Sequence, residues 1–336
     1  MSFSYYRARD ARDAISMATS QPRTAFVAGG TDLMQLFRAG ITAPGLVIDI
    51  GRFGLDRIES RESDRAVVSV EIGALARMSD VAAHPLICSA FPALAEALLA
   101  SASPQVRHMG TIGGNLLQRT RCTYFRNSTL PCNKRQPGSG CGALSGENRL
   151  HALFGTSAQC VATHASDAAV ALSALEANVQ LLGRDSARIV SIDNFFLPPG
   201  TEPARETVLA PGELVMAIEI PCTALTRHSR YLKVRDRASF EFAVVSVAAG
   251  LQIADGRILA ARISAGGVGT TPWRLRQCEA LLVDVPVDAP SLARAAAAAT
   301  EEAQPLSANG FKMELLRRSV LRVLHDLANV PQRDAV

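Results

Sequence analysis

Long hydrophobic runs are missing from this sequence of 336 residues. No stretch of about 18 consecutive apolar residues occurs, so we expect no transmembrane helix. The first residues also lack the apolar core of a signal peptide, because charges recur at Arg7, Arg9 and Asp10. We therefore expect synthesis in the cytoplasm, where thiols stay reduced and clustered cysteines favour metal binding over disulfides.

A strong charge excess and the common nucleotide-binding motifs are also missing. Lys and Arg number 35 against 31 Asp and Glu, and this net charge of +4 favours neither a nucleic acid nor a membrane surface. The glycine-rich segments match neither GxGxxG nor GxxxxGKS/T, so a nicotinamide-binding Rossmann domain is not supported. We find no nucleophile–base pair and no metal-ligand spacing among the six histidines, and we predict no catalytic residue.

Acidic residues are absent from the stretch 97–146, which nevertheless carries six bases. These bases are Arg107, Arg119, Arg121, Arg126, Lys134 and Arg135. Gly, Pro, Ser and Asn are dense from 127 to 146, so this part is predicted to be a loop. A loop of this length inside a compact domain is usually functional or disordered.

The remaining sequence has the pattern of a mixed α and β protein, and its length predicts two or three domains. Short apolar runs at 25–28 and 46–50 are typical of strands, with a helix between them at 31–39. Ser166 is a typical N-cap for a further helix. Beyond residue 224 we predict three long strands, at 230–235, 242–253 and 257–268, and helices at 274–282, 290–302 and 312–327.

Two segments carry paired glycines, AGGTDL at 28–33 and TIGGNL at 111–116. Paired glycines let the backbone approach a ligand closely and point its N–H groups at an anion. Each segment alone is equally compatible with an ordinary turn that needs a positive φ. Two such segments in one domain favour a bound diphosphate.

Four of the seven cysteines fall in one stretch, Cys122, Cys132, Cys141 and Cys160, with the spacing C-x9-C-x8-C-x18-C. This spacing is neither that of a zinc finger nor the compact ferredoxin pattern. An iron–sulfur cubane, a structural zinc ion and four free thiols all remain open. The six bases favour the cubane, because its four thiolates leave a net negative charge. The other three cysteines, Cys88, Cys222 and Cys278, are predicted to be inert small hydrophobes.

Five motifs occur in an order that resembles one family. They are AGGTDL (28–33), TIGGNL (111–116), SDAAVAL (166–172), PGELV (211–215) and KVRDRASFEFAVVSVAA (233–249). Over residues 3–330 the chain resembles the FAD-binding medium subunit of the molybdenum hydroxylases, the xanthine dehydrogenase and aldehyde oxidase family. The cysteine-bearing stretch further resembles the iron–sulfur version of this subunit in bacterial periplasmic aldehyde oxidoreductases of the PaoABC type.

The resemblance implies an α+β fold in two parts. Residues 1–222 would form a two-lobed FAD-binding domain of the vanillyl-alcohol-oxidase type, interrupted by an iron–sulfur insert loop at 118–162. Residues 224–330 would form a small α+β domain of the CO dehydrogenase flavoprotein type, with a three-stranded sheet and helices.

The resemblance also implies cofactor contacts. The FAD diphosphate would be held by Ala25, Phe26, Val27, Ala28, Gly29, Gly30, Thr31, Asp32 and Leu33, and by Thr111, Gly113, Gly114 and Asn115. Asp167 would bind the ribityl or flavin end, Val215 and Lys233 the ring region, and Ser101 and Gln118 are further contacts. Cys122, Cys132, Cys141 and Cys160 would hold a 4Fe-4S cluster. Read without the family, Asp167 is a helix N1 carboxylate favoured by the dipole, and Lys233 a solvated strand residue.

The function implied is electron transfer. Substrate chemistry would occur on a molybdenum-cofactor large subunit, and 2Fe-2S clusters on a small subunit would pass electrons to the FAD of this chain and then to an external acceptor. We expect a heterotrimer with periplasmic residence through co-export with a signal-bearing partner, or otherwise a cytoplasmic one. The alternatives are the flavin subunit of a xanthine dehydrogenase or hydroxybenzoyl-CoA reductase, a self-sufficient FAD oxidoreductase, and a non-catalytic zinc protein.

Overall fold

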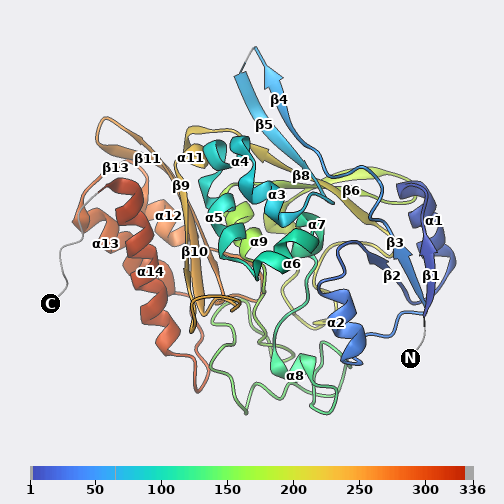
Figure 1. Cartoon of the computed structure of the whole chain (residues 1–336). Coiled ribbons are helices and arrows are strands. Elements are labelled where there is room, and N and C mark those ends of the chain that lie inside the picture. The colour runs from blue at the N-terminus through green and yellow to red at the C-terminus, as the bar shows by residue number, and fades with distance from the viewer. Residues whose placement is uncertain (1–2, 65, 330–336) are drawn as a thin grey trace.

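The computed structural model describes residues 3–64 and 66–329, so residues 1–2, 65 and 330 of the predicted domain ranges lie outside it. Three sheets follow one another along the chain, and each is covered by helices on at least one side (Figure 1). The first is a parallel sheet with strand order β1-β3-β2, formed by β1 (Ser4–Arg7), β2 (Thr24–Val27) and β3 (Leu46–Asp49). Helices α1 (Ala11–Ser20) and α2 (Leu33–Arg38) complete this lobe.

The second lobe is built on a five-stranded antiparallel sheet of order β4-β5-β8-β6-β7. Its strands are β4 (Ile58–Ser63), β5 (Ala66–Gly73), β6 (Asn178–Leu182), β7 (Ala187–Ser191) and β8 (Leu214–Pro221). Its helices are α3 (Met78–Ala83), α4 (Pro85–Ala90), α5 (Pro92–Ala100), α6 (Pro104–Met109), α7 (Ile112–Leu116), α9 (Asp167–Ala174) and α10 (Ile192–Phe195). The β4–β5 hairpin projects from the body of the molecule (Figure 1).

Helix α9 is the central element of the molecule. All of its residues are buried, as expected for a helix that is apolar on every side apart from its start. It packs against α5 of its own lobe and against β10 and β11 of the next domain. The predicted N-cap is confirmed, because the Ser166 side chain accepts a hydrogen bond from the Ala169 backbone N–H at 3.0 Å.

The C-terminal domain has the predicted three long strands, β9 (Ser229–Val234), β10 (Val245–Ala254) and β11 (Arg257–Gly266). The β10–β11 turn uses Asp255 and Gly256, both at positive φ, as a two-residue hairpin requires. Two strands were missing from the prediction, β12 (Trp273–Arg274) and β13 (Val285–Pro286), which extend the sheet to five strands. Each is two residues long, too short for an alternating pattern to indicate it.

Five helical segments of different lengths cover this sheet. They are α11 (Ala224–Arg227), α12 (Arg276–Leu282), α13 (Ala289–Ala297), η1 (Ala298–Thr300) and α14 (Phe311–Ala328). The apolar residues of α12 to α14 share one core with β10 and β11. The predicted α+β class, with two lobes and a smaller α+β domain after them, is confirmed. Within the described residues, none of the helices has the length and hydrophobicity needed to span a bilayer.

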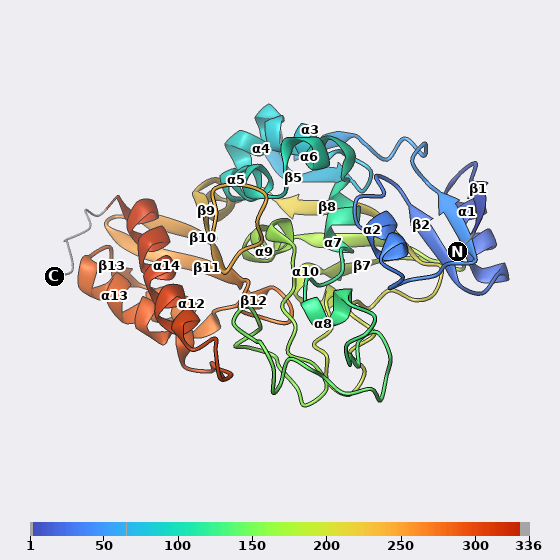
Figure 2. The ribbon, with the colours of Figure 1, turned by 60° about the horizontal axis from the view of Figure 1, so that its bottom comes forward.

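The insert, residues 118–162, forms a layer of irregular chain below the two larger sheets (Figures 1 and 2). Its single helix is α8 (Thr123–Arg126), and isolated strand-like pairings join Cys132 to Cys141 and Ser157 to Cys160. The prediction of a long loop therefore holds for most of the insert. The loop is nevertheless ordered by its own hydrogen bonds.

A buried arginine connects the second lobe to the C-terminal domain. The Arg274 side chain is 7% exposed; it contacts the Glu279 carboxylate through Nε at 2.8 Å and Asp193 of α10 through Nη1 at 3.0 Å. We predict that Arg274→Met destabilises the protein by about 3–5 kcal/mol, because it leaves a carboxylate buried without its partner. The measurement is urea unfolding followed by circular dichroism.

Arg276 supplies the matched control for this prediction. It contacts the same Asp193 at 3.3 Å, but its side chain is 70% exposed. Arg276→Met should therefore change the unfolding free energy by no more than about 0.5 kcal/mol. Equal changes in the unfolding free energy of the two variants would contradict the inference that Arg274 connects the two parts of the molecule.

Candidate functional site

The first glycine pair lies in the turn between β2 and α2. Gly30 has a φ of +68°, and a Cβ at Gly29 would overlap the carbonyl of Met109 at the end of α6. Glycine is therefore required at both positions, by conformation at one and by close approach at the other. The backbone N–H groups from Gly29 to Leu33 have no hydrogen-bond acceptor among the described residues. Such a row of free N–H groups at a strand-to-helix turn is suited to an anion.

The second glycine pair is built differently from the prediction. Residues 112–116 form helix α7 rather than a loop, because the Thr111 side chain caps the N–H of Gly114 at 3.2 Å. The N–H of Gly113 is also engaged, by the Ala74 carbonyl at 2.9 Å. A Cβ at Gly113 would lie 2.9 Å from the Ala74 Cβ, so this glycine allows close packing. The predicted loop is therefore a short helix, and the Asn115 side chain at its end accepts a hydrogen bond from the Ser166 hydroxyl and donates to the Met78 sulfur at 3.5 Å. The predicted diphosphate contacts of this segment stay a prediction.

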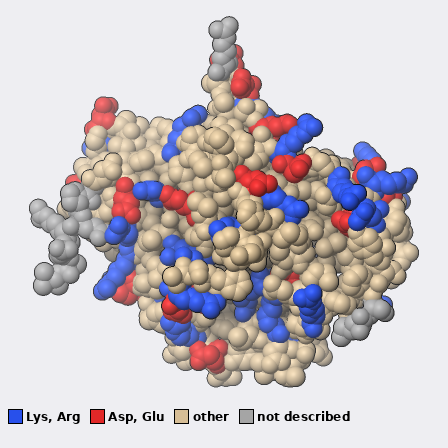
Figure 3. Space-filling view, in the orientation of Figure 1, with Lys and Arg blue, Asp and Glu red and all other residues tan. Residues whose placement is uncertain are grey.

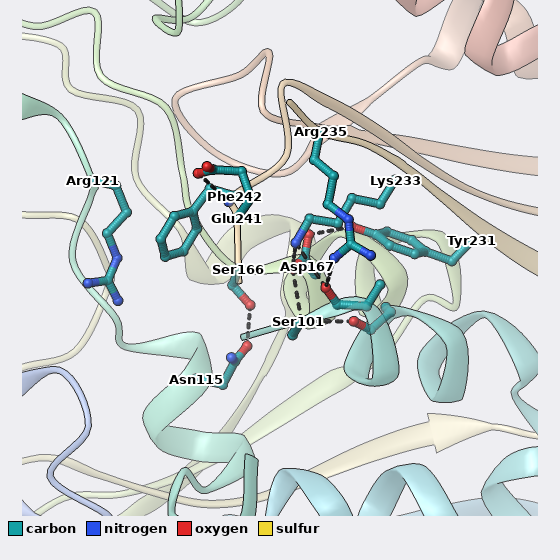
Figure 4. A network of polar contacts seen from close by, with 12 residues as sticks. Ser101, Asn115, Arg121, Ser166, Asp167, Tyr231, Lys233, Arg235, Glu241 and Phe242 are labelled. Carbon is teal, nitrogen blue, oxygen red and sulfur yellow. Dashed lines mark hydrogen bonds and ion pairs between the residues drawn. The ribbon is translucent and has the colours of Figure 1, made fainter. Parts of the chain in front are cut away.

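The predicted residues Ser101, Asp167 and Lys233 come together in one buried network (Figure 4). The Asp167 carboxylate accepts hydrogen bonds from Ser101 Oγ at 2.8 Å, from Lys233 Nζ at 2.8 Å and from Tyr231 Oη at 2.5 Å. Burial, with the Asp167 charge added, raises the pKa of Tyr231 well above its usual value, so the phenol donates. The network therefore fixes the start of α9 against α5 and β9.

The interpretation of Lys233 as a solvated strand residue is wrong, since its side chain is only 3% exposed. Asp167 is indeed the first residue of α9, but it has three side-chain partners in addition to the helix dipole. Tyr231 was missed in the sequence. The signal was present, because Tyr231 and Lys233 are two residues apart on one strand and so face the same side.

A pocket opens beside this network, and we name it the Asp167 pocket. Its lining residues are Arg121, Thr163, His164, Ala165, Ser166, Asp167, Val170, Phe242, Ala243, Ser246, Gly266 and Gly267. The Arg121 guanidinium lies 4.7 Å from the centre of the Phe242 ring, and in Figure 4 both side chains appear to the left of Ser166 and Asn115. Burial lowers the pKa of Arg121 to about 10, and its Nε has no partner within the described residues. An unpaired buried donor in a pocket is a suitable contact for a polar ligand.

The remaining predicted FAD contacts are spread over several elements. Ala25, Phe26 and Val27 belong to β2, and the Gln118 side chain donates to the Asn115 carbonyl at 3.0 Å. Val215 lies on β8 in the buried core of the second lobe and does not line the Asp167 pocket. The Asp32 side chain points to the insert, where it contacts Arg121 at 3.0 Å and Arg126 at 2.8 Å.

The four predicted cysteine ligands line one small cavity, the cysteine cavity. Its lining residues are Cys122, Tyr124, Phe125, Pro131, Cys132, Asn133, Lys134, Cys141, Ala143, His151, Gln159, Cys160 and Ala162. No acidic side chain contributes to this lining, and Lys134 is its single Lys or Arg. The structure thus brings together four cysteines that are spread along the irregular chain from 122 to 160.

Two of the thiols in this cavity, Cys122 and Cys160, have raised pKa values. Burial raises the pKa of Cys122 to about 11, although the backbone N–H groups of Phe125 and Tyr124 donate to its sulfur. Burial also raises the pKa of Cys160, against the opposing effect of Lys134. Such thiols are poor free nucleophiles, because the thiolate is the reactive form. The inward N–H groups would instead stabilise sulfur that carries negative charge through a metal.

Most of the six bases of the acid-free stretch anchor the insert. Arg121 and Arg126 pair with Asp32, while Arg119 and Lys134 pair with Glu206, and both acids lie outside the insert. Arg135 donates to the carbonyls of Tyr124, Phe125 and Leu130, and Arg107 donates to that of Ser101. Lys and Arg side chains lie around the lower part of the face shown in Figure 3, near the insert. The predicted compensation of a negative cluster therefore rests on Lys134 among these six.

Single-ion sites are absent from the described part of the chain. No three His, Cys, Asp or Glu side chains in residues 3–64 and 66–329 are placed to hold one metal ion. A histidine lies close to one of the four cysteines, since His151 Nε2 is 3.2 Å from the Cys122 sulfur. Burial lowers the pKa of His151 to about 4, so its ring is neutral.

The two spaces adjoin each other. Arg121 lines the Asp167 pocket and its neighbour Cys122 lines the cysteine cavity. A second segment does the same, since residues 163–167 line the pocket while Cys160 and Ala162 line the cavity. The Thr120 hydroxyl, which donates to the Thr163 carbonyl at 2.9 Å, joins the two segments. The pocket and the cavity thus share a wall made of two short, hydrogen-bonded stretches.

We predict that Gly29→Ala abolishes FAD retention. The added Cβ would overlap the Met109 carbonyl, so the turn and α6 must separate, at an overpacking cost of about 1–3 kcal/mol. The row of N–H groups would then lose its position. The readout is the flavin absorbance of the purified protein, with thermal unfolding to check the fold.

Gly45→Ala is the control, because the nearest atom to its added Cβ would lie at an ordinary 3.8 Å. This variant should retain flavin and unfold near the temperature of the parent protein. Full flavin occupancy in the Gly29 variant would show that the β2–α2 turn is not the diphosphate site.

Comparison with known proteins gives these features a family. Residues 1–223 match the family described as the FAD binding domain in molybdopterin dehydrogenase, and residues 230–327 match the CO dehydrogenase flavoprotein C-terminal domain. The chain is 42% identical over 327 residues to the aldehyde oxidoreductase FAD-binding subunit PaoB of Escherichia coli, covering 96% of this chain and 97% of that protein. It is 27% identical over 307 residues to the carbon monoxide dehydrogenase medium chain of Afipia carboxidovorans, covering 91% and 88%.

Solved structures show the same fold. Reconstituted CO dehydrogenase from Oligotropha carboxidovorans superposes with a TM-score of 0.76 at 22% identity, covering 98% of this chain and 99% of that one. Quinoline 2-oxidoreductase from Pseudomonas putida 86 gives 0.75 at 23% identity, covering 98% of both chains. The predicted resemblance is thereby confirmed: the chain belongs to the FAD-binding medium subunits of the molybdenum hydroxylases and is an oxidoreductase subunit of that family.

Proposed function

We propose that this chain is the FAD- and 4Fe-4S-containing electron-transfer subunit of a molybdenum-dependent aldehyde oxidoreductase. In this proposal it receives electrons from 2Fe-2S clusters of a small subunit and delivers them to an external acceptor. One observation carries the proposal, namely that a cavity lined by four cysteines shares a wall with the Asp167 pocket. FAD supplies two-electron chemistry when bound, and a 4Fe-4S cluster exchanges single electrons.

The described residues fit FAD at two places. The free N–H groups from Gly29 to Leu33 are suited to the diphosphate. Because Gly29 has no side chain, the backbone of this turn can lie directly against the end of α6. The Asp167 pocket offers the unpaired Arg121 Nε, and Ser166 also belongs to its lining. The hydrogen bonds of Asp167 to Ser101, Tyr231 and Lys233 hold the pocket wall rigid while the ligand exchanges.

The cysteine cavity fits a cubane better than a zinc ion. A tetrahedral zinc site draws its ligands around one centre, with bonds of about 2.3 Å to sulfur. A cubane instead takes one cysteine at each iron, so its four sulfurs lie further apart. The acid-free lining and the N–H groups aimed at Cys122 and Cys160 further favour a negatively charged cluster.

The names of the relatives support a division of labour between subunits. The described residues show no base paired with a nucleophile, and the buried His151 and His164 are both neutral, with pKa values lowered to about 4. The relatives are named as an FAD-binding subunit and as medium chains, which are parts of larger enzymes. We therefore place substrate oxidation on a molybdenum-cofactor large subunit, and aldehydes are the substrate class of the relative at 42% identity.

Cys132→Ser tests the cluster. Cys132 is buried in the cavity, and serine at this position removes one of four thiolates. We expect the parent protein to contain about four iron atoms with a broad visible absorption, and the variant to lose most of both. Cys88→Ser is the control, because this cysteine is exposed and far from the insert in sequence. Equal iron in all three proteins would refute the ligand assignment, and zinc in place of iron would refute the cluster.

Purification from the native host tests the assembly. We expect a tagged chain to retain a molybdenum-containing large subunit and a 2Fe-2S small subunit in equal amounts, and the complex to oxidise aldehydes. The isolated chain should show no aldehyde oxidation with any acceptor, because in this proposal the substrate is oxidised on the large subunit. Aldehyde turnover by the isolated chain would support a self-sufficient flavoenzyme instead.

A further inference from the structure

Lys312 is a completely buried lysine at the start of the C-terminal helix. Its exposure is 0%, and it lies in the first turn of α14, far in sequence from every motif discussed so far. Among the described residues, its ammonium makes no ion pair; its hydrogen bonds go to backbone carbonyls. Burial lowers the pKa of Lys312 to about 7. A buried, unpaired cation is costly, so its presence calls for a role beyond packing.

The two acceptors of Lys312 belong to the walls of the two spaces. Nζ donates to the His151 carbonyl at 3.0 Å, and the His151 ring lines the cysteine cavity against Cys122. Nζ also donates to the Gly267 carbonyl at 2.7 Å, and Gly267 lines the Asp167 pocket at the end of β11. One ammonium group therefore joins a residue that lines the cavity to a residue that lines the pocket.

The chain before α14 reinforces this connection. The Asn309 side chain donates to the carbonyls of His151 and Ala152 at 3.1 and 3.2 Å. The Asn148 side chain, itself completely buried, contacts Ser307 at 3.0 Å and accepts from the Ala308 N–H at 2.9 Å. These hydrogen bonds hold the later part of the insert, around residues 148–152, against the C-terminal domain. Asn148 and Asn309 are neutral, so they fix position without contributing charge.

We propose that Lys312 is a positioning residue that holds the two cofactor sites at a fixed separation and places a positive charge between them. The inference rests on the proposed function. A cation near two centres that gain electrons stabilises their reduced forms more than their oxidised forms. Lys312 thereby raises the midpoint potentials of the flavin and the cluster. Its contacts with the two carbonyls keep the cavity and the pocket at fixed positions relative to each other.

Three substitutions at this position separate charge from hydrogen bonding. Lys312→Met keeps the length but removes both, Lys312→Gln keeps a donor without the charge, and Lys312→Arg keeps the charge. The control is Arg318→Met, which removes a cation from the same helix at a side chain that is 76% exposed. The full chain is titrated anaerobically at about pH 6, where the ammonium is protonated, and the flavin and cluster absorptions are followed separately.

We expect lower flavin and cluster potentials in Lys312→Met and Lys312→Gln, and the potentials of the parent protein in Lys312→Arg and Arg318→Met. Unchanged flavin potentials in both uncharged variants would overturn the proposal. Failure of both uncharged variants to fold, with Lys312→Arg stable, would also overturn it, because the charge would then serve folding alone. Absence of iron from the parent protein would instead refute the cluster in the proposed function, and the flavin potentials would still decide the role of Lys312.

Discussion

The carboxylate of Asp32 is the contact on which the arrangement of both sites depends. It lies at the start of α2, directly after the glycine turn, and receives the Arg119 backbone N–H at 2.8 Å together with the side chains of Arg121 and Arg126. Arg121 and Arg126 repel each other in this partly buried place, and the repulsion contributes to the lowered pKa of Arg121. Without the Asp32 carboxylate, the positive charges of Arg121 and Arg126 would not be neutralised where the insert begins, after α7. One side chain thus joins the predicted diphosphate turn to the wall between the pocket and the cavity.

The same arrangement recurs wherever separate parts of the chain meet. Glu206 receives Arg119 and Lys134 from the insert, Arg274 connects α10 to α12, and Asp167 connects α5, α9 and β9. Buried ion pairs of this kind contribute little net stability compared with apolar packing, but breaking one is strongly destabilising. They therefore specify how the parts fit together more than they stabilise each part. For the proposed function, in which two cofactors lie at a set distance, such specificity is the relevant property.

Local patterns predicted the regular elements well and the site only in part. The long strands β9 to β11 and the Ser166 cap follow from alternation and capping chemistry within a few residues. The gathering of the four cysteines into one cavity also agrees with the sequence interpretation. Helix α7 was missed, because two glycines favour a loop and only the Thr111 cap and the contact with Ala74 make the helix form. The partners of Asp32 and Lys312 lie 45 to 161 positions away, so no local signal indicates them.

The bases of the insert show why composition alone misled the interpretation of charge. Six bases without an acid suggested a positive field around a negative cluster, yet four of them pair with Asp32 and Glu206, which approach from outside the insert. The cations that reach the cavity wall are Lys134, one of these four, and Lys312, which comes from the other end of the chain. Lys134 is balanced by Glu206, whereas the acceptors of Lys312 are neutral carbonyls. The positive charge that is free to act on a redox centre therefore comes from the C-terminal helix, which makes that helix part of the cofactor environment and not only a cover for its own sheet.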